Sequence, residues 1–254
     1  MANEYLFGKG KVSLAERDAN GAVSKVLYLG NCPELKISGA ADKIEHYESE
    51  SGSNVRDRSI IKTSSLEMSV TLESITDNNL ALLLWGGVQN IAAATGVDYP
   101  FPLGIVAGET HMVPNGFNMS NTVIHDSAVS PVVYPTSKYV IDPVFGTVKF
   151  VDVASYTQPF KLTSDRAAAV AIPMLTNVAP TRFLRFEGLN LGNPGASVSQ
   201  KFLVELYIVQ FEPVKDLSLI GTEFGKFDLQ GALQLDDTRV ANGALGGFGR
   251  IVKL

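Results

Sequence analysis

Features that many proteins use for covalent stability or membrane insertion are scarce in this sequence of 254 residues. Cys32 is the single cysteine, which excludes an internal disulfide and fits folding in a reducing cytoplasm. The longest markedly apolar run, Ala167–Ile172, is far too short to cross a bilayer, and no basic-then-apolar leader opens the chain. We therefore expect no membrane as a partner.

Charged residues are also few. They make up 19% of the chain, whereas about 25% is usual for soluble domains, and a weakly charged surface indicates that partners cover much of it. The formal net charge of −5 disfavours a protein that grips nucleic acid, because such a grip needs a face rich in Lys and Arg. It does not disfavour a protein past which nucleic acid slides.

Patterns that support catalysis or metal binding are missing as well. The histidines, His46, His111 and His125, lie far apart, without the spacing of a metal site. No serine lies in a G-x-S-x-G motif, and the glycine clusters lack the frame of a phosphate-binding loop. Asp236 and Asp237 are adjacent, so on a strand they would point to opposite faces, and we interpret them as a solvated strand end. We predict no catalytic residue, no metal site and no cofactor, hence no enzyme.

Short segments of alternating apolar and polar residues are abundant, and they predict about ten strands against one good helix. The strongest, Phe202–Phe211, is apolar on both faces and predicts a central strand that is covered on both sides. It contains Glu205, a charge among apolar neighbours, for which Arg185 is one conceivable partner. Phe227–Leu235 alternates cleanly and predicts a last strand with one polar side. The fold class is therefore mainly β, a sandwich or barrel.

The one good helix is predicted over Ile75–Gly87. Thr76 or Asp77 is placed to cap its free amide groups, and the Gly-Gly pair that ends this range is typical of a helix stop. Its apolar residues are dense, which favours packing against a sheet. Trp85 is expected in the core beside Leu82.

The middle of the chain, residues 95–195, differs from the rest in composition. Prolines and glycines separate short predicted strands at roughly ten-residue spacing, which is typical of a sandwich or barrel. One hairpin is predicted over Tyr139–Val151, and the glycine-rich tail at 243–250 is expected to be flexible. We interpret residues 1–254 as a single domain, with core halves at about 1–94 and 196–254 and a β-rich region inserted at 95–195.

The stretch Leu35–Glu73 is the most unusual. Two limbs with alternating apolar residues flank a polar segment, Asp42–Lys62, which is too long for a tight turn and too polar for a core. Each limb has about twelve residues and reaches roughly 40 Å if extended. We predict an arm that contacts a neighbour; the alternative is a mobile loop of mixed charge.

The charges of this arm are sorted by limb, acidic on the outgoing one and basic on the returning one, with Lys43 and Asp57 as exceptions. A single exposed ion pair contributes only about 0.2–1 kcal/mol to stability. Unlike charges on neighbouring copies would therefore set the register of the contact, while apolar contacts would hold the copies together. The candidate inter-subunit residues are Asp42, Glu45, His46, Glu48, Glu50, Arg56, Arg58 and Lys62.

Several segments occur in an order that matches a known family. They are FGKGKVSLAERDANG, YLGNCPELKIS, HYESESG, RDR, SSLEMSVTLESI, TDNNLALLLWG, LRFEGLN, FLVELYIVQFEPVKDLSLI and EFGKFDLQGALQLD. Together they resemble the major tail tube protein of long non-contractile-tailed bacteriophages, the siphophage type. The resemblance covers nearly the whole chain and is weakest over Thr95–Asp165.

The resemblance implies a tail-tube-type β-sandwich or barrel with one flanking α-helix, on Thr76–Leu84, and a long hairpin loop, on Asp42–Lys62. It implies hexameric rings that stack into a tube and deliver DNA, which passes through the lumen without specific binding. The implied partners are further copies of the chain and the tape measure, tail terminator and distal tail proteins. The implied location is the virion tail, assembled in the cytoplasm of the bacterial host.

Three other readings stay open. A secretion-system tube protein has a related fold. A virion decoration or carbohydrate-binding β-sandwich module would present clustered aromatic side chains on an exposed face. The candidates for such a cluster are Tyr134, Tyr139, Phe145, Phe150 and Tyr156. An enzyme such as a glycosidase needs two convergent carboxylates, and no such pair stands out.

Overall fold

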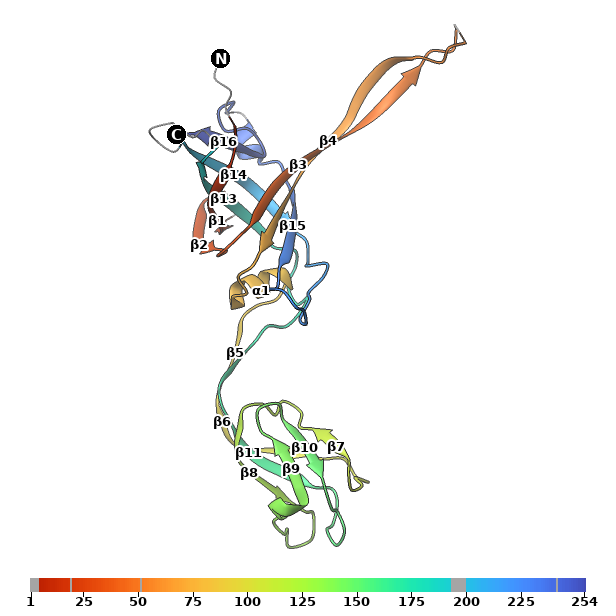
Figure 1. The fold of residues 1–254 in the computed structure, drawn as a ribbon, viewed down its shortest axis with the longest axis vertical. Coiled ribbons are helices and arrows are strands. Elements are labelled where there is room, and N and C mark those ends of the chain that lie inside the picture. Colours follow the sequence, from red (N-terminus) through yellow and green to blue (C-terminus); the bar gives the residue numbers. More distant parts are fainter. Residues whose placement is uncertain (1–4, 19, 51, 193–199, 241) are drawn as a thin grey trace. The chain divides into compact units, whose positions relative to one another are not determined.

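The computed structural model describes residues 5–18, 20–50, 52–192, 200–240 and 242–254. The fold is mainly β, as the sequence predicts, and the strands form antiparallel sheets (Figure 1). The chain divides into two compact units. Unit 1 is Met1–Val88 with Ile172–Leu254, and unit 2 is Gln89–Ala171.

Unit 1 is built on one eight-stranded sheet with the order β2-β1-β13-β14-β15-β4-β3, in which β16 also pairs with β14. Its strands are β1 (Gly8–Arg17), β2 (Val23–Tyr28), β3 (Glu34–Tyr47), β4 (Arg56–Leu72), β13 (Thr181–Asn190), β14 (Gln200–Phe211), β15 (Phe227–Leu233) and β16 (Gly249–Lys253). The predicted insertion at 95–195 extends too far at its C-terminal end, where it includes β13 of this sheet, and it begins six residues too late at its N-terminal end. The unit that interrupts the core is 89–171.

The central strand is β14, as predicted. One edge pairs with β13, and the other is shared, with β16 along residues 202–206 and β15 along residues 209–211. The expectation of a flexible tail at 243–250 was therefore wrong for its last residues, which begin β16. The short β15 leaves backbone groups of β14 unpaired, and β16 satisfies them, a long-range effect that the glycine-rich local sequence conceals.

A bulge in β14 changes which of its side chains enter the core. Arg182 pairs with Val209 and Leu184 with Leu206, so three steps on β14 match two on β13. The regular alternation that places Phe202, Val204 and Leu206 on one face of β14 ends at this bulge, because the extra residue shifts it. Leu206 and Val209 consequently point into the same core, while the fully buried Tyr207 packs on the opposite face.

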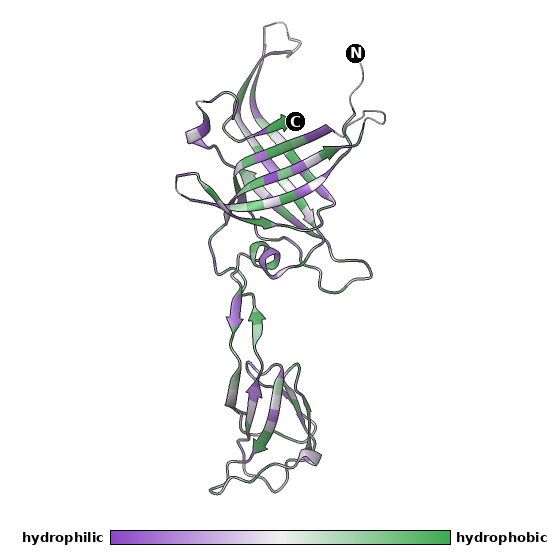
Figure 2. Ribbon diagram, turned by 90° about the vertical axis from the view of Figure 1, so that its left-hand side faces the viewer, coloured by the Kyte–Doolittle hydropathy of each residue, from purple (hydrophilic) through white to green (hydrophobic). Residues whose placement is uncertain are grey.

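The core of unit 1 lies between the strands and the helix α1 (Asp77–Leu83), and Figure 2 shows the apolar positions along these strands. The predicted helix is confirmed, although it is shorter than expected. Thr76 is its N-cap and accepts a hydrogen bond from the Asn79 amide at 3.2 Å. The buried Asn79 side chain donates to the Leu29 and Ser74 carbonyls, which ties the helix to the end of β2 and to the segment after β4.

Unit 2 contains three small sheets, ordered β7-β10-β9, β6-β11-β8 and β12-β5. Its elements are β5 (Gln89–Ile91), β6 (Ala94–Pro100), β7 (Thr110–Met112), β8 (Met119–His125), the 3-10 helix η1 (Thr136–Lys138), β9 (Tyr139–Asp142), β10 (Thr147–Phe150), β11 (Lys161–Arg166) and β12 (Ala169–Ala171). The hairpin predicted over Tyr139–Val151 is confirmed as β9 and β10.

Aromatic side chains form the core of unit 2. Tyr134, Phe150 and Phe160 are fully buried and in ring contact, and Tyr139 stacks on Tyr134. Of the aromatic residues considered for a carbohydrate surface, only Phe145 is largely exposed. These side chains therefore stabilise the fold instead of forming an exposed aromatic face.

Gly146 permits a close backbone approach in the β9–β10 turn. It has φ +66°, and an added Cβ would lie 1.7 Å from the Gly116 carbonyl oxygen. Gly104 has φ +84° but open space around it. A left-handed conformation costs about 1–2 kcal/mol for a non-glycine residue, so Gly104→Ala should lose that amount. Gly146→Ala should lose at least about 1 kcal/mol more because of the clash. Denaturant unfolding followed by near-ultraviolet circular dichroism measures both, and equal losses would contradict the packing described.

Candidate functional site

The predicted arm is a two-stranded ribbon. β3 and β4 pair from Glu34 opposite Thr71 out to Tyr47 opposite Arg56, whereas β15 pairs with β4 only along residues 67–72. Beyond that point β4 continues to residue 56, and among the described residues only β3 pairs with it there (Figure 1). We call residues 39–66 the ribbon. At about 3.3 Å per residue, the part of β4 that extends beyond its pairing with β15 is about 35 Å long. The polar segment Asp42–Lys62, expected as a loop, is therefore largely strand.

Two bulges interrupt the ribbon, both on β4. The register skips Lys62 between the pairs of Asp42 and Lys43, and it skips Asp57 between the pairs of His46 and Tyr47. An extra residue bends its strand and increases the local twist. The bulges thus give the ribbon a fixed shape.

Opposite charges on the two limbs partly neutralise each other within the ribbon. Arg56 Nη1 lies 2.5 Å from Glu45 Oε1, and His46 Nδ1 lies 2.6 Å from Asp57 Oδ1. A hydrogen bond from the Tyr47 hydroxyl, together with Arg56, lowers the pKa of Glu45 below its ordinary value. Antiparallel pairing places the limbs side by side, so Glu45, His46 and Arg56 have partners in their own chain.

The other predicted residues are distributed along the ribbon and its tip. Glu48 shapes the turn, because its carboxylate accepts hydrogen bonds from the Glu50 amide and the Ser53 hydroxyl. Asp42, Glu50, Arg58 and Lys62 are all exposed. The structure thus brings Glu48 and Glu50 together at the tip and leaves the remaining charges spread over the strands.

Sequence reasoning treated this segment as polar and missed its exposed apolar side chains. Ile44 and Ile60 form a cross-strand pair, and each is 59% exposed. Ile61, Tyr47 and Val55 are also largely exposed. In the sequence, the adjacent isoleucines Ile60 and Ile61 were the signal from which this exposed apolar surface could have been predicted. Large apolar side chains on a ribbon with no layer above it indicate a surface that a partner covers.

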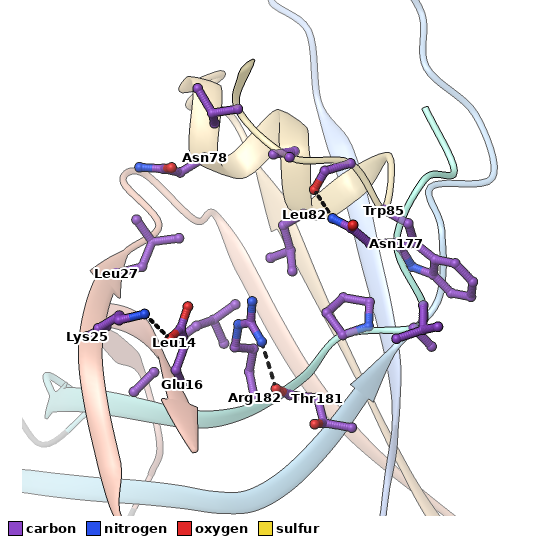
Figure 3. Close-up of a pocket in the computed structure, with 18 of the residues that line it drawn as sticks. Leu14, Glu16, Lys25, Leu27, Asn78, Leu82, Trp85, Asn177, Thr181 and Arg182 are labelled. Carbon is purple, nitrogen blue, oxygen red and sulfur yellow. Dashed lines mark hydrogen bonds and ion pairs between the residues drawn. The ribbon is translucent and has the colours of Figure 1, made fainter. Parts of the chain in front are cut away.

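A cavity of about 860 Å³ lies between β1, β2, α1 and residues 177–182 (Figure 3). Leu14, Leu82 and Trp85 line it, so Trp85 is only partly buried instead of lying in the core as expected. Its single carboxylate, Glu16, forms an exposed ion pair with Lys25 at 2.7 Å. One neutralised carboxylate does not supply the acid–base pair that hydrolysis needs.

The described parts of the chain contain no group of three or more His, Cys, Asp or Glu side chains placed to hold a metal ion. Within the same residues, no helix is both long and apolar enough to span a membrane.

Almost the whole chain matches the model of one protein family. No curated protein matches this sequence. One family model matches residues 5–252, and its description is "Protein of unknown function UCP028589". Because the match spans both units, this chain belongs to that family.

Proposed function

We propose that this protein is a structural subunit of a tail-tube type, which self-associates into hexameric rings that stack into a hollow tube. The observation that carries the proposal is the ribbon. A two-stranded ribbon is only marginally stable alone in water, and this one exposes Ile44, Ile60 and Ile61. It gains stability when a neighbouring surface covers it.

A second copy of the chain is the cover that supports ring formation. In a head-to-tail contact the ribbon of one copy meets a different surface of the next, and the ring closes when the rotation between copies divides a full turn. The ribbon and the main sheet lie on the same unit, so each copy has both a projecting element and a body to receive one.

The low charge of the chain fits a conduit for DNA. An acidic or neutral wall repels phosphate at short range, and physiological salt screens the repulsion beyond roughly 8 Å. The net charge of −5 is compatible with such a lumen, through which DNA would pass without specific binding. In this proposal the rings belong to a virion tail, and the other tail proteins cap, fill and terminate the tube.

The direct test is microscopy of the purified protein at increasing concentration and salt. We expect rings or tubes in negative stain, with six-fold symmetry in end-on views, and a matching rise in sedimentation coefficient. A protein that sediments as a monomer under every condition would contradict the proposal.

A further inference from the structure

A second, smaller cavity on the main sheet is rich in arginine. It has a volume of about 290 Å³ and is lined by β1, β2, β13 and β14, with Arg250 from β16 and Arg239 from the short helix α2 (Asp237–Val240). Arg185 and Glu205 complete its charged residues, so three cationic groups face one carboxylate. We call this cavity the arginine pocket. Arg185 and Arg239 are also paired with carboxylates outside this lining, Glu187 at 2.9 Å and Asp236 at 3.1 Å, so each arginine has one carboxylate partner.

The contacts within the arginine pocket leave its cations able to bind another anion. Glu205 is buried, and its carboxylate accepts a hydrogen bond from Arg250 Nε at 2.7 Å. Arg185 directs its Nε to Glu187 at 2.9 Å, while its Nη1 lies 3.9 Å from Glu205. Arg239 directs its Nε to Asp236 at 3.1 Å, and its guanidinium lies 4.2 Å from the centre of the Tyr207 ring. Among the described residues, the Nη groups of Arg185, Arg239 and Arg250 donate no hydrogen bond to a protein acceptor. Guanidinium groups bind carboxylates through parallel N–H donors, so these Nη groups can still bind another carboxylate.

The floor of the arginine pocket is apolar. Leu14, Ala15 and Phe183 are buried there, and Val26 lines its rim while 71% exposed. The pocket therefore favours an occupant that combines an acidic group with apolar side chains.

The tip of the ribbon has this combination. Residues 44–55 contain three glutamates and neither Lys nor Arg. Glu50 is exposed at the turn, beside the exposed apolar side chains of Tyr47 and Val55. Glu45 is paired with Arg56 and Glu48 accepts hydrogen bonds within the turn, so the exposed Glu50 is the acidic residue considered for a contact with another copy.

We propose that the arginine pocket receives the acidic tip of the ribbon of a second copy of this chain, with Glu50 binding Arg185. This rests on the proposed function and adds the site of contact. The tip lies about 35 Å beyond the last β4–β15 pair, and β4 is separated from β13 by β14 and β15 in the sheet order, so the pocket of the same chain is out of its reach.

Cross-linking tests the contact without reversing a charge beside the buried Glu205. In a Cys32→Ser background, one batch carries Glu50→Cys and another carries Arg185→Cys. Mixing them under mild oxidation should give a disulfide-linked heterodimer, at least tenfold more than a mixture in which Lys226→Cys, an exposed cation elsewhere on unit 1, replaces Arg185→Cys. Equal yields would overturn the proposal.

A second measurement compares neutral variants, which preserve side-chain size. Glu50→Gln and Arg185→Gln should each raise the concentration at which assembly begins by about tenfold, and the double variant should add little to either. Glu223→Gln, at another exposed glutamate, should leave that concentration unchanged. Normal assembly of both single variants would overturn the contact while ring formation stands. A wild-type protein that never assembles would overturn both proposals.

Discussion

Replacing Tyr47–Asp57 with Asn-Gly is expected to abolish ring formation while the isolated subunit stays folded. His46 and Arg58 are directly opposed in the register, so a two-residue hairpin turn joins them without strain. The removed side chains with described burial are exposed or half-buried and make their side-chain contacts with one another or with the ribbon. We therefore expect a change of no more than about 1 kcal/mol in the free energy of unfolding. Sedimentation velocity and thermal unfolding measure the two effects.

A matched variant separates the tip from the apolar strands of the ribbon. Ile44→Thr with Ile60→Thr keeps the ribbon length and β propensity but removes exposed apolar surface. If apolar contact holds the copies together, this double variant should weaken assembly while thermal stability is retained. A shortened chain that no longer folds would show that the ribbon stabilises its own unit, and one that still forms rings would remove the ribbon from the assembly surface.

Asp236→Ala is expected to cost about 3 kcal/mol in the free energy of unfolding, because it leaves the partly buried cationic groups of Arg17 and Arg239 without their buried partner. Asp236 is 2% exposed, and its carboxylate lies 2.7 Å from Arg17 Nη2 and 3.1 Å from Arg239 Nε. It also accepts hydrogen bonds from the amide and hydroxyl of Thr238. Urea unfolding at neutral pH measures the loss.

The adjacent Asp237 gives a control with the same chemistry. It is exposed, so Asp237→Ala should change stability by less than about 0.5 kcal/mol. Similar losses for the two variants would contradict the buried network. The interpretation of both residues as a solvated strand end was wrong for Asp236, which is buried, while Asp237 is exposed but begins the short helix α2.

Acid should reduce the difference between wild type and Asp236→Ala. Burial raises the pKa of Asp236, but hydrogen bonds from Thr238 and Arg17 outweigh this and hold the pKa below its ordinary value. A carboxyl group with a lowered folded-state pKa contributes its full stability above the unfolded-state pKa, about 3.9, and loses it as pH falls through the folded-state pKa. The gap between the two proteins should therefore be constant near neutral pH and narrow below about pH 4.

Local patterns in the sequence were enough to predict the main elements. Alternation placed β14 and the β9–β10 hairpin, and Thr76 marked the start of α1. The family resemblance, the ring and the tube stay predictions that the assembly experiments address.

Features that depend on distant partners were not predictable from local pattern. Asp236 is buried because Arg17, 219 residues away in sequence, reaches it. The bulge that redirects Val209 depends on the register with β13, and the internal pairing of Glu45 with Arg56 depends on the register of the ribbon. In each case the burial or pairing of the side chain depends on residues distant in sequence, and the neighbouring residues in sequence do not determine it.

The order in which strands pair has a consequence for synthesis on the ribosome. Strands β1 and β13 are neighbours, yet β13 begins only at Thr181, after all of unit 2 has been translated. The strands of unit 2 pair among themselves, so unit 2 can fold before β13 and β15 are translated. Until then, β1 and β4 lack these neighbouring strands of the main sheet. We therefore expect β1 to β4, which include exposed isoleucines, to be the part of the nascent chain that most needs chaperones to prevent premature association with other copies.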